Sequence, residues 1–302
     1  LRSKVSISCL REKKTTLLKN SYCDIPYKVV HYGSNLLSDH LEVMVMCYSP
    51  GVMDGDSLEL TVDCTANSEM KLFTQSFNKL HPMKTGASQF SNIRVGKGAL
   101  FQYLPHPTIP FKDAIFETSN EIHVEETGHL IWGDIISGGR IYSGEKFEFG
   151  KVHSHTKIYY GKKLIIYDNQ LLQPGSQPIS DMLFFEGFTH QATLIIVSSN
   201  AVALKTELDE MLIEQLTDLR YGFTLCTPNS IMLRALGTSG DAIYEWLGKL
   251  SKMCFSFIQF ANDQRAQNTP AATKQTTIKE PVKTPKTKTG ITDKKIKKIT
   301  LQ

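Results

Sequence analysis

Apolar and polar residues alternate along much of the chain between residues 41 and 199. In "SLELTVDCT" the alternation is clean, with Leu58 and Leu60 on one side and Glu59 and Thr61 on the other. A period of two is typical of a β-strand that buries one face. Similar short segments follow one another, separated by turn formers such as "VGKG" and "PGSQP". The pattern therefore predicts a mainly β fold.

No helical pattern interrupts this run of strands. Strands that alternate with helices would predict βαβ units and a parallel doubly wound sheet, so their absence favours strands stacked into a sandwich or a helical β-stack. We therefore expect a stacked, β-helix-like body.

Helical spacing appears only late in the chain. A first helix is predicted by apolar residues three and four apart, namely Leu204, Leu208, Met211, Leu212, Leu216 and Leu219. A second helix is predicted to start at "TSGD", where Thr238 and Asp241 have capping-box spacing. Its apolar stripe consists of Ile243, Trp246, Leu247, Leu250, Met253, Cys254 and Phe257. Packing of this stripe on the β body is favoured over contact with a partner.

Charge divides the chain into two parts. The 302 residues carry a formal net charge of +4, but residues 265–302 hold ten basic and two acidic side chains, so the remainder is mildly acidic. The tail has no aromatic residue and is rich in Lys, Thr and Pro, which predicts disorder. We expect one β-rich domain over residues 1–262 and a basic, disordered tail over residues 263–302. A nucleic-acid arm and a solubilising extension both fit the tail, and the extension is favoured.

Other features bound the class of protein. The longest apolar runs, such as "LIIV" and "LIIY", are too short to span a bilayer, and no signal-peptide series opens the sequence. We therefore expect a cytoplasmic protein that binds neither membrane nor nucleic acid. The six cysteines form no CxxC pair, which predicts reduced thiols rather than a zinc site.

The segment "SPGVMDGD", residues 49–56, combines a proline and two glycines with Asp54 and Asp56. A phosphate-binding loop would need a lysine followed by serine or threonine, and a dinucleotide-binding loop would need a helix after it. The segment has no such lysine, and a predicted strand follows it. It is therefore interpreted as a tight turn that carries two acids.

No catalytic motif stands out in the sequence. It contains no Gly-x-Ser-x-Gly nucleophile elbow and no HExxH zinc motif. A pair of catalytic carboxylates stays open, because any β protein with 30 acidic residues can supply one. A carboxylate-dependent hydrolase is therefore an alternative, but an enzyme is not the favoured interpretation.

Several side chains are candidate metal ligands. His153 and His155 share a face if their segment is a strand, which permits chelation of nickel, zinc or copper, although two surface histidines without metal are the simpler interpretation. Asp134 and Asp168 each close a strongly apolar segment, where an unpaired charge is costly. Arg140 is an ion-pair candidate for Asp134. The alternative is that these acids line a wet internal passage, since oxygen ligands hold a borderline divalent ion weakly.

The order of several motifs is more specific than any one of them. "SPGVMDGD", "TQSFNKLH", "LPHPTIPFKDA", "WGDIISGGRIYSGEKFEF", "IIYDNQLL" and "FEGFTH" follow one another in a series that resembles the urease accessory protein family UreD, called UreH in some organisms. The resemblance covers roughly residues 5–260. Val52 departs from it, standing where a second glycine is common. The matching positions are Pro50, Gly51, Gly55, Asp56, Thr74, Lys79, Leu104, Pro105, Ile109, Phe111, Gly139, Arg140, Gly144, Glu145 and Phe147.

The resemblance implies a maturation factor rather than an enzyme. UreD-like proteins have a stacked, β-helix-like body and two helices. They bind UreF, which recruits the GTPase UreG, and the assembly, commonly doubled, docks on apo-urease. Ni²⁺ is thought to reach the urease active site through a passage inside the UreD-like protein, so no cofactor is bound tightly. A metal-independent scaffold that only docks the accessory proteins is the alternative.

For this chain we hypothesise that residues 49–56 form a turn that presents an acid to such a passage. The predicted passage residues are Asp56, Asp54, Asp134 and Asp168, with His153 and His155 as weaker candidates. The plain alternative for Asp56 is that it only caps the turn by accepting hydrogen bonds from backbone amides. Arg140 is expected to be structural and to pair with an acid or a carbonyl.

Overall fold

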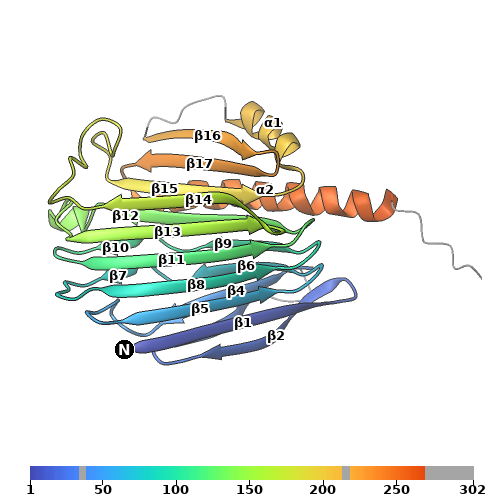
Figure 1. Cartoon of the computed structure of the whole chain (residues 1–302), viewed down its shortest axis with the longest axis horizontal. Helices are drawn as coiled ribbons and strands as arrows, with labels where there is room; N and C mark the ends of the chain where they lie inside the picture. The colour runs from blue at the N-terminus through green and yellow to red at the C-terminus, as the bar shows by residue number, and fades with distance from the viewer. Residues whose placement is uncertain (34–38, 213–217, 269–302) are drawn as a thin grey trace, which may run out of the picture.

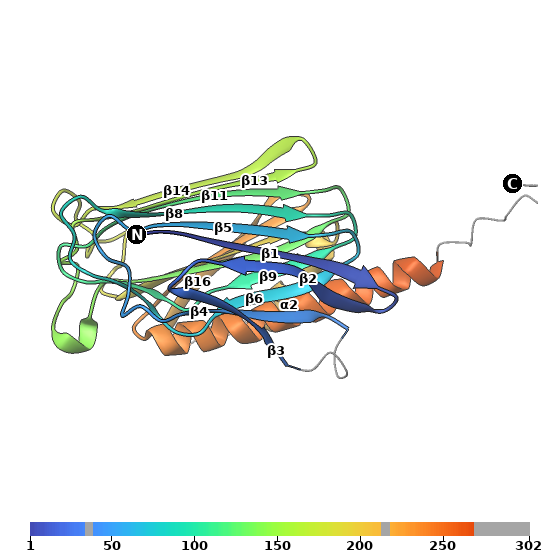
Figure 2. The ribbon, with the colours of Figure 1, turned by 90° about the horizontal axis from the view of Figure 1, so that it is seen from below.

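The body consists of two stacked β-sheets, with a long helix on the outer face of one of them (Figures 1 and 2). The computed structural model describes residues 1–33, 39–212 and 218–268. The seven-stranded sheet contains, in spatial order, β14 (Lys163–Leu172), β13 (Lys151–Tyr160), β11 (Ile115–Val124), β8 (Ala87–Val95), β5 (Ser57–Cys64), β1 (Arg2–Glu12) and β2 (Thr15–Cys23).

The ten-stranded sheet lies opposite. Its main path runs through β16 (Leu219–Thr227), β17 (Ser230–Gly237), β15 (His190–Val197), β12 (His129–Ser137), β9 (Leu100–Leu104), β6 (Glu69–Thr74), β4 (Leu41–Cys47) and β3 (Tyr27–Tyr32). The short strands β10 (Thr108–Pro110) and β7 (Asn78–Leu80) pair with each other beside β12. The helices are α1 (Ala201–Met211) and α2 (Gly240–Asn268), and Ile141–Ser143 form a 3₁₀ turn.

Successive strands alternate between the two sheets. The chain passes from β5 to β6, then to β8, β9, β11, β12 and β13, and within each sheet these neighbours pair in parallel. A parallel pair needs a long crossover connection, and here the crossover is the strand of the opposite sheet, so no helix is required. This arrangement confirms the predicted mainly β, β-helix-like body.

The two ends of the stack differ in loop length. At one end the connections are short turns, in which Asn67, Gly98 and Thr127 adopt left-handed conformations with φ of 59°, 65° and 69°. At the other end, on the left in Figure 1, longer loops connect the strands, among them residues 48–56 and 138–150. Residues 49–56 therefore belong to the long-loop end.

Two apolar layers hold the structure together. One fills the space between the sheets and includes Val5, Ile7, Val62, Ile93, Ile122 and Ile158. The other joins the outer face of the ten-stranded sheet to the two helices, and Figure 2 shows α2 running beneath that sheet. Burial of Ile243, Leu247, Leu250 and Cys254 in this second layer confirms that the stripe of the second helix packs on the β body. Phe255 and Ile258 extend the buried stripe.

Two predicted helix boundaries were wrong. The first helix ends at Met211, and Leu219 begins β16, because its side chain is buried as part of the sheet. The predicted Leu216 position lies outside the described residues. The second helix begins at Gly240, where Ser239 Oγ accepts a hydrogen bond from the backbone N–H of Ala242 at 3.3 Å. The cap is therefore one residue later than the predicted Thr238.

The second helix also continues to Asn268, past the predicted domain boundary at residue 262. The remainder of the predicted tail, residues 269–302, lies outside the described residues. All six cysteines are free thiols. Among the described residues, no helix is both long and apolar enough to cross a membrane.

Candidate functional site

Polar side chains interrupt the apolar interior between the sheets. In the seven-stranded sheet, the strand register aligns inward-facing polar residues of four neighbouring strands, β8, β11, β13 and β14. One row contains Ser91, Asn120, Thr156 and Asp168, and the next row contains Gln89, Thr118, Ser154 and Gln170. We call these two rows the polar band. Apolar rows flank it on both sides.

Hydrogen bonds between neighbouring strands satisfy much of the polar band. Asn120 Nδ2 donates to Thr156 Oγ1 at 3.1 Å, and Thr118 Oγ1 donates to Ser154 Oγ at 3.0 Å. Such mutual pairing is what allows polar groups to stay in the interior, because an unpaired buried group loses its water without compensation.

A cavity of about 530 Å³ extends from the long-loop end to the polar band. Its inner wall comes from both sheets and includes Leu58, Gln89, Thr118, Asn120, Tyr103, Trp132 and Asp134. Its mouth is formed by Lys79 of β7 and by the 48–56 loop with Ser49, Pro50, Gly51, Met53 and Asp56. Cys47, Thr74, Pro105 and His106 lie nearby on the wall. The cavity therefore connects the "SPGVMDGD" turn with the predicted candidate Asp134.

Asp56 caps the turn and also lines the cavity. Its Oδ2 accepts a hydrogen bond from the backbone N–H of Met53 at 2.8 Å, which closes the turn, and its Oδ1 lies 2.9 Å from the Leu1 nitrogen. Gly55, with φ of 79°, supplies the left-handed residue that this turn requires. The same carboxylate lines the cavity, so Asp56 is a capping residue that lies at the mouth.

Asp54 does not face the interior. Its Oδ1 accepts hydrogen bonds from the Thr85 backbone N–H at 2.9 Å, the Thr85 hydroxyl at 2.7 Å and the Gly86 N–H at 2.9 Å. These donors, the Thr85 hydroxyl first, lower the pKa of the Asp54 carboxyl to about 2. The side chain is exposed and joins two loops, so the prediction that it faces a passage is wrong.

Asp134 is the acid that the structure places deep in the cavity. It lies on β12 with its side chain directed between the sheets, and it lines the cavity wall. Burial, followed by the negative charge of Asp168, raises the pKa of the Asp134 carboxyl to about 6. The predicted ion pair with Arg140 is wrong, and within the described ranges Asp134 has no ion-pair partner at all.

Asp168 occupies the far end of the polar band and is neutralised there. Its Oδ1 lies 2.5 Å from the guanidinium of Arg234 on β17, and its Oδ2 accepts from Gln170 Nε2 at 2.7 Å. Gln170 also reaches Thr193 Oγ1, at 3.3 Å, in the ten-stranded sheet. Asp168 is not among the residues that line the cavity.

Arg140 has the structural role predicted for it. Its guanidinium forms a two-point ion pair with Glu145, one contact of which is Nε to Oε2 at 2.9 Å, and it lies 4.4 Å from the centre of the Phe111 ring. Gly139 is required because a Cβ there would lie 2.8 Å from the Glu145 carbonyl oxygen. Hence this part of the family pattern fixes the conformation of a long loop.

The other predicted family positions surround the mouth. A Cβ on Gly51 would lie 2.5 Å from the carbonyl oxygen of Lys79, so glycine is needed where these two loops touch. Thr74 Oγ1 accepts the backbone N–H of His106 at 2.9 Å. Pro50, Gly51, Thr74, Lys79 and Pro105 all line the cavity.

His153 and His155 lie away from the cavity. The alternation of β13 places them on the outer face of the seven-stranded sheet, opposite to the inward-facing Ser154 and Thr156. Their ring centres are 3.9 Å apart. They are therefore not part of the interior passage that was predicted to include them.

The prediction missed most of the polar band, including Asn120, Thr118 and Gln170. A signal was present in the sequence, since each of the four strand segments carries two polar residues at the same point of its otherwise apolar inward face. Only the register between strands reveals that these interruptions coincide. Arg234, the partner of Asp168, is 66 residues away in the sequence and gives no comparable signal.

The fold and the cavity define a β-helical protein whose apolar interior is interrupted by a polar band. A model of the family described as UreD urease accessory protein matches residues 2–267. The chain belongs to this family.

Individual relatives agree with the family match. The urease accessory protein UreD of Acetivibrio thermocellus is 37% identical over 76% of this chain and 87% of its own length. UreD of Flavobacterium johnsoniae is 29% identical over 78% of this chain and 86% of its own length. UreH of Helicobacter pylori strain J99 is 28% identical over 71% of this chain and 80% of its own length.

Proposed function

We propose that the protein is a non-catalytic urease maturation factor that provides an interior path for Ni²⁺ on its way to the apo-urease active site. The observation that carries this proposal is Asp134, an acid in the wall of a cavity that opens at the long-loop end. Membership in a family of urease accessory proteins supports the maturation role. UreF, the GTPase UreG and urease are the proposed partners, in a doubled cytoplasmic assembly.

The chemistry of the wall fits an ion in transit. Carboxylate, hydroxyl and amide oxygens are supplied by Asp56 at the mouth and by Thr118, Asn120 and Asp134 further in. Oxygen ligands bind a borderline divalent ion less tightly than thiolates or several imidazoles do. A path of this kind would let Ni²⁺ enter and leave, whereas a tight site would retain it.

Ionised Asp134 gives the path its negative charge. With a pKa of about 6, this carboxyl is mainly ionised at neutral pH and mainly protonated below pH 5. A carboxylate must be deprotonated to ligate a metal. Nickel transfer should therefore weaken as the pH falls through 6.

The ion pair between Asp168 and Arg234 stands at the far end of the polar band. Its positive member would repel an approaching cation, and its negative member is already occupied. An ion that continued along the polar band beyond Asp134 would meet this pair, so the pair is the proposed barrier on that side.

The test is urease activation in cells that express variants of this protein. Asp134→Asn should abolish nickel loading of urease while co-purification with urease and the other accessory proteins is retained, and Asp134→Glu should restore part of the loading. Asp54→Asn is the matched control, because this acid lies outside the cavity. Normal nickel content in urease from the Asp134→Asn and Asp56→Asn cells would overturn the passage.

A metal-independent scaffold is the second candidate. It is favoured by the pairing of Asp168 with Arg234 and by the capping role of Asp56, which account for both acids without a metal. In that case the Asp134→Asn variant would load urease fully, and only variants that break complex assembly would fail.

A further inference from the structure

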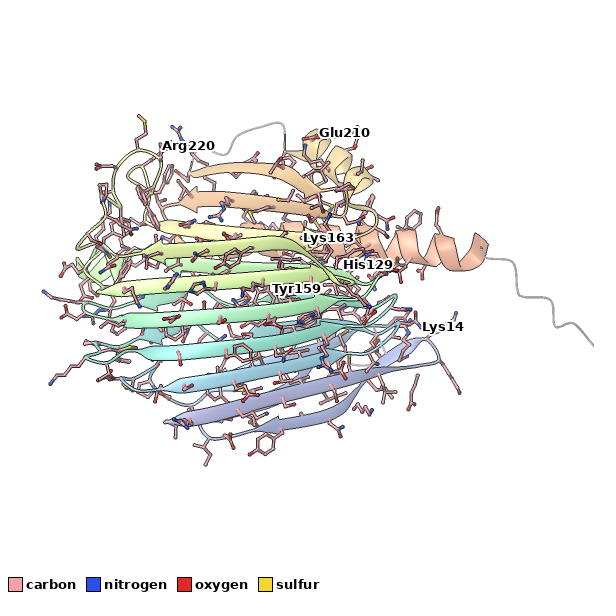
Figure 3. All side chains as sticks on the ribbon, viewed as in Figure 1. Lys14, His129, Tyr159, Lys163, Glu210 and Arg220 are labelled. Carbon is pink, nitrogen blue, oxygen red and sulfur yellow. The ribbon has the colours of Figure 1, made fainter. Side chains whose placement is uncertain are left out.

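A cluster of metal-ligating side chains lies on the outer face of the seven-stranded sheet. Glu117 on β11 is the register partner of His153 on β13, and His155 follows two residues later on the same face. One donor atom from each of these three residues lies within 4.8 Å of the other two. Tyr159, which Figure 3 labels on β13, shares this outer face.

The spacing is close to that of a coordination sphere. Donor atoms about 2.1 Å from an ion in a tetrahedral site are about 3.4 Å apart, so donors at the 4.8 Å limit need to approach by about 1.4 Å at most. Glu117 and His155 already lie 3.8 Å apart, from Oε1 to Nε2. Two paired strands hold all three Cα positions, so the adjustment concerns side-chain rotation only.

Asn169 orients one of the histidines. His153 Nε2 lies 2.9 Å from Asn169 Oδ1 on β14. A carbonyl oxygen can only accept a hydrogen bond, so Nε2 must carry the proton, which leaves Nδ1 of a neutral His153 with its lone pair. Metal-binding histidines commonly donate their other ring N–H in this way.

We propose that Glu117, His153 and His155 form an external binding site for a divalent transition-metal ion of the Ni²⁺, Cu²⁺ or Zn²⁺ class. Two imidazoles and one carboxylate suit these ions better than Mg²⁺ or Ca²⁺, which prefer oxygen ligands. Lys151, whose Nζ lies 3.8 Å from Glu117 Oε2, competes for the carboxylate and lowers the affinity.

The position of the cluster gives it access to the mouth of the interior cavity. The residues that line an outer groove include Glu117, Lys151, Asp56 and Ser57, and the last two also line the interior cavity. An ion bound by the cluster would therefore lie on the surface beside the entrance. The external site does not depend on the proposed interior path, because it lies on the opposite face of the sheet.

The experiment is a calorimetric titration of NiSO₄ into the protein purified without a histidine tag. The variants are His153→Ala, His155→Ala and Glu117→Gln. His123→Ala is the matched control, since His123 lies on the same outer face, 2.9 Å from Glu121 and stacked on Tyr159. Asp54→Asn is the second control, because this acid lines neither the interior cavity nor the outer groove, and Lys151→Gln removes the competing cation.

The wild-type protein should bind Ni²⁺, and each substitution in the cluster should lower the affinity for Ni²⁺ by at least tenfold. Even the loss of a residue that only orients a metal ligand lowers metal affinity by about 10- to 100-fold. Asn169→Ala should lower the affinity for Ni²⁺ by about 10- to 100-fold. The two controls should bind Ni²⁺ as tightly as the wild type, and Lys151→Gln should bind it more tightly. Absence of Ni²⁺ binding by the wild type, or an unchanged affinity in the His153→Ala and His155→Ala double variant, would overturn the site. None of these readouts uses urease, so failure here leaves the proposed function to its own test.

Discussion

Replacement of Asp134 by asparagine should stabilise the protein at neutral pH. The carboxyl lies between the sheets, and burial raises its pKa from an ordinary value of 3.8 to about 6. In the folded protein it keeps its proton up to about pH 6, whereas in the unfolded chain it loses the proton near pH 4. Between these values the folded state binds more protons, so stability falls as the pH rises.

The size of this effect follows from the shift in pKa. A rise of roughly two pKa units corresponds to about 3 kcal/mol of lost stability above pH 7, and about half of that loss is present at pH 5. Water in the cavity reduces the penalty, which makes about 3 kcal/mol an upper bound. Asparagine is almost isosteric with aspartate and has no charge, so Asp134→Asn removes the penalty together with its pH dependence.

The assay is urea unfolding of wild type and Asp134→Asn between pH 5 and 7.5. The difference in unfolding free energy between the two proteins should favour the variant and should grow by about 1 kcal/mol across this range. Every other titrating group is common to both proteins and cancels in the difference. Parallel pH curves, or a variant that is less stable at pH 7.5, would refute a raised pKa at this position.

Three further outcomes are expected. Asp54→Ala should lower the Tm at pH 7, because a carboxyl with a folded pKa of about 2 stabilises the folded protein above pH 4. This stabilisation is lost as the pH falls towards 2, so an equal loss of Tm at pH 7 and pH 2.5 would contradict the prediction. Gly51→Ala should cost about 1–3 kcal/mol of unfolding free energy, because its Cβ would press on the Lys79 carbonyl, and an unchanged urea midpoint would show that the loop yields freely. Trp246→Ala should cost about 2 kcal/mol, since this half-buried ring lies 5.1 Å from that of Tyr221, and should leave co-purification with UreF intact. An unchanged Tm with loss of UreF would reverse that assignment.

The fold was largely predictable because its signals are local. The alternation of Leu58 and Leu60 with Glu59 and Thr61 requires only one strand and one buried face. The stripe of α2 likewise depends on one period of 3.6 residues, and burial of Ile243 and Leu247 confirms it. The end of α1 was not predictable in this way, because Leu219 fits the helical period but pairs with Gly237 in a sheet.

The site was less predictable because its features depend on contacts between distant segments. Asp54 and Asp56 are two residues apart in one turn, yet one joins the loop at Thr85 and the other lines the cavity. The two residues are of the same type, so the difference comes from their positions in the folded turn. Pairing of Asp168 with Arg234 likewise follows from the alignment of two different sheets.

The interior of the stack indicates that Asp134 does not stabilise the fold. One row across the seven-stranded sheet is apolar on six of the seven strands, all except β2, and consists there of Ile7, Val62, Ile93, Ile122, Ile158 and Ile166. The same backbone could carry apolar residues in the polar band, because the pleat and the distance between strands are the same in both rows. Asn120 and Thr156 at least compensate each other by hydrogen bonding, and Asp168 has Arg234. Among the described residues Asp134 has no ion pair, and the hydrogen bond that it accepts from the backbone N–H of Ile135 offsets its burial only in part. Its ionisation therefore weakens the fold at the pH where an interior path for a cation would need it.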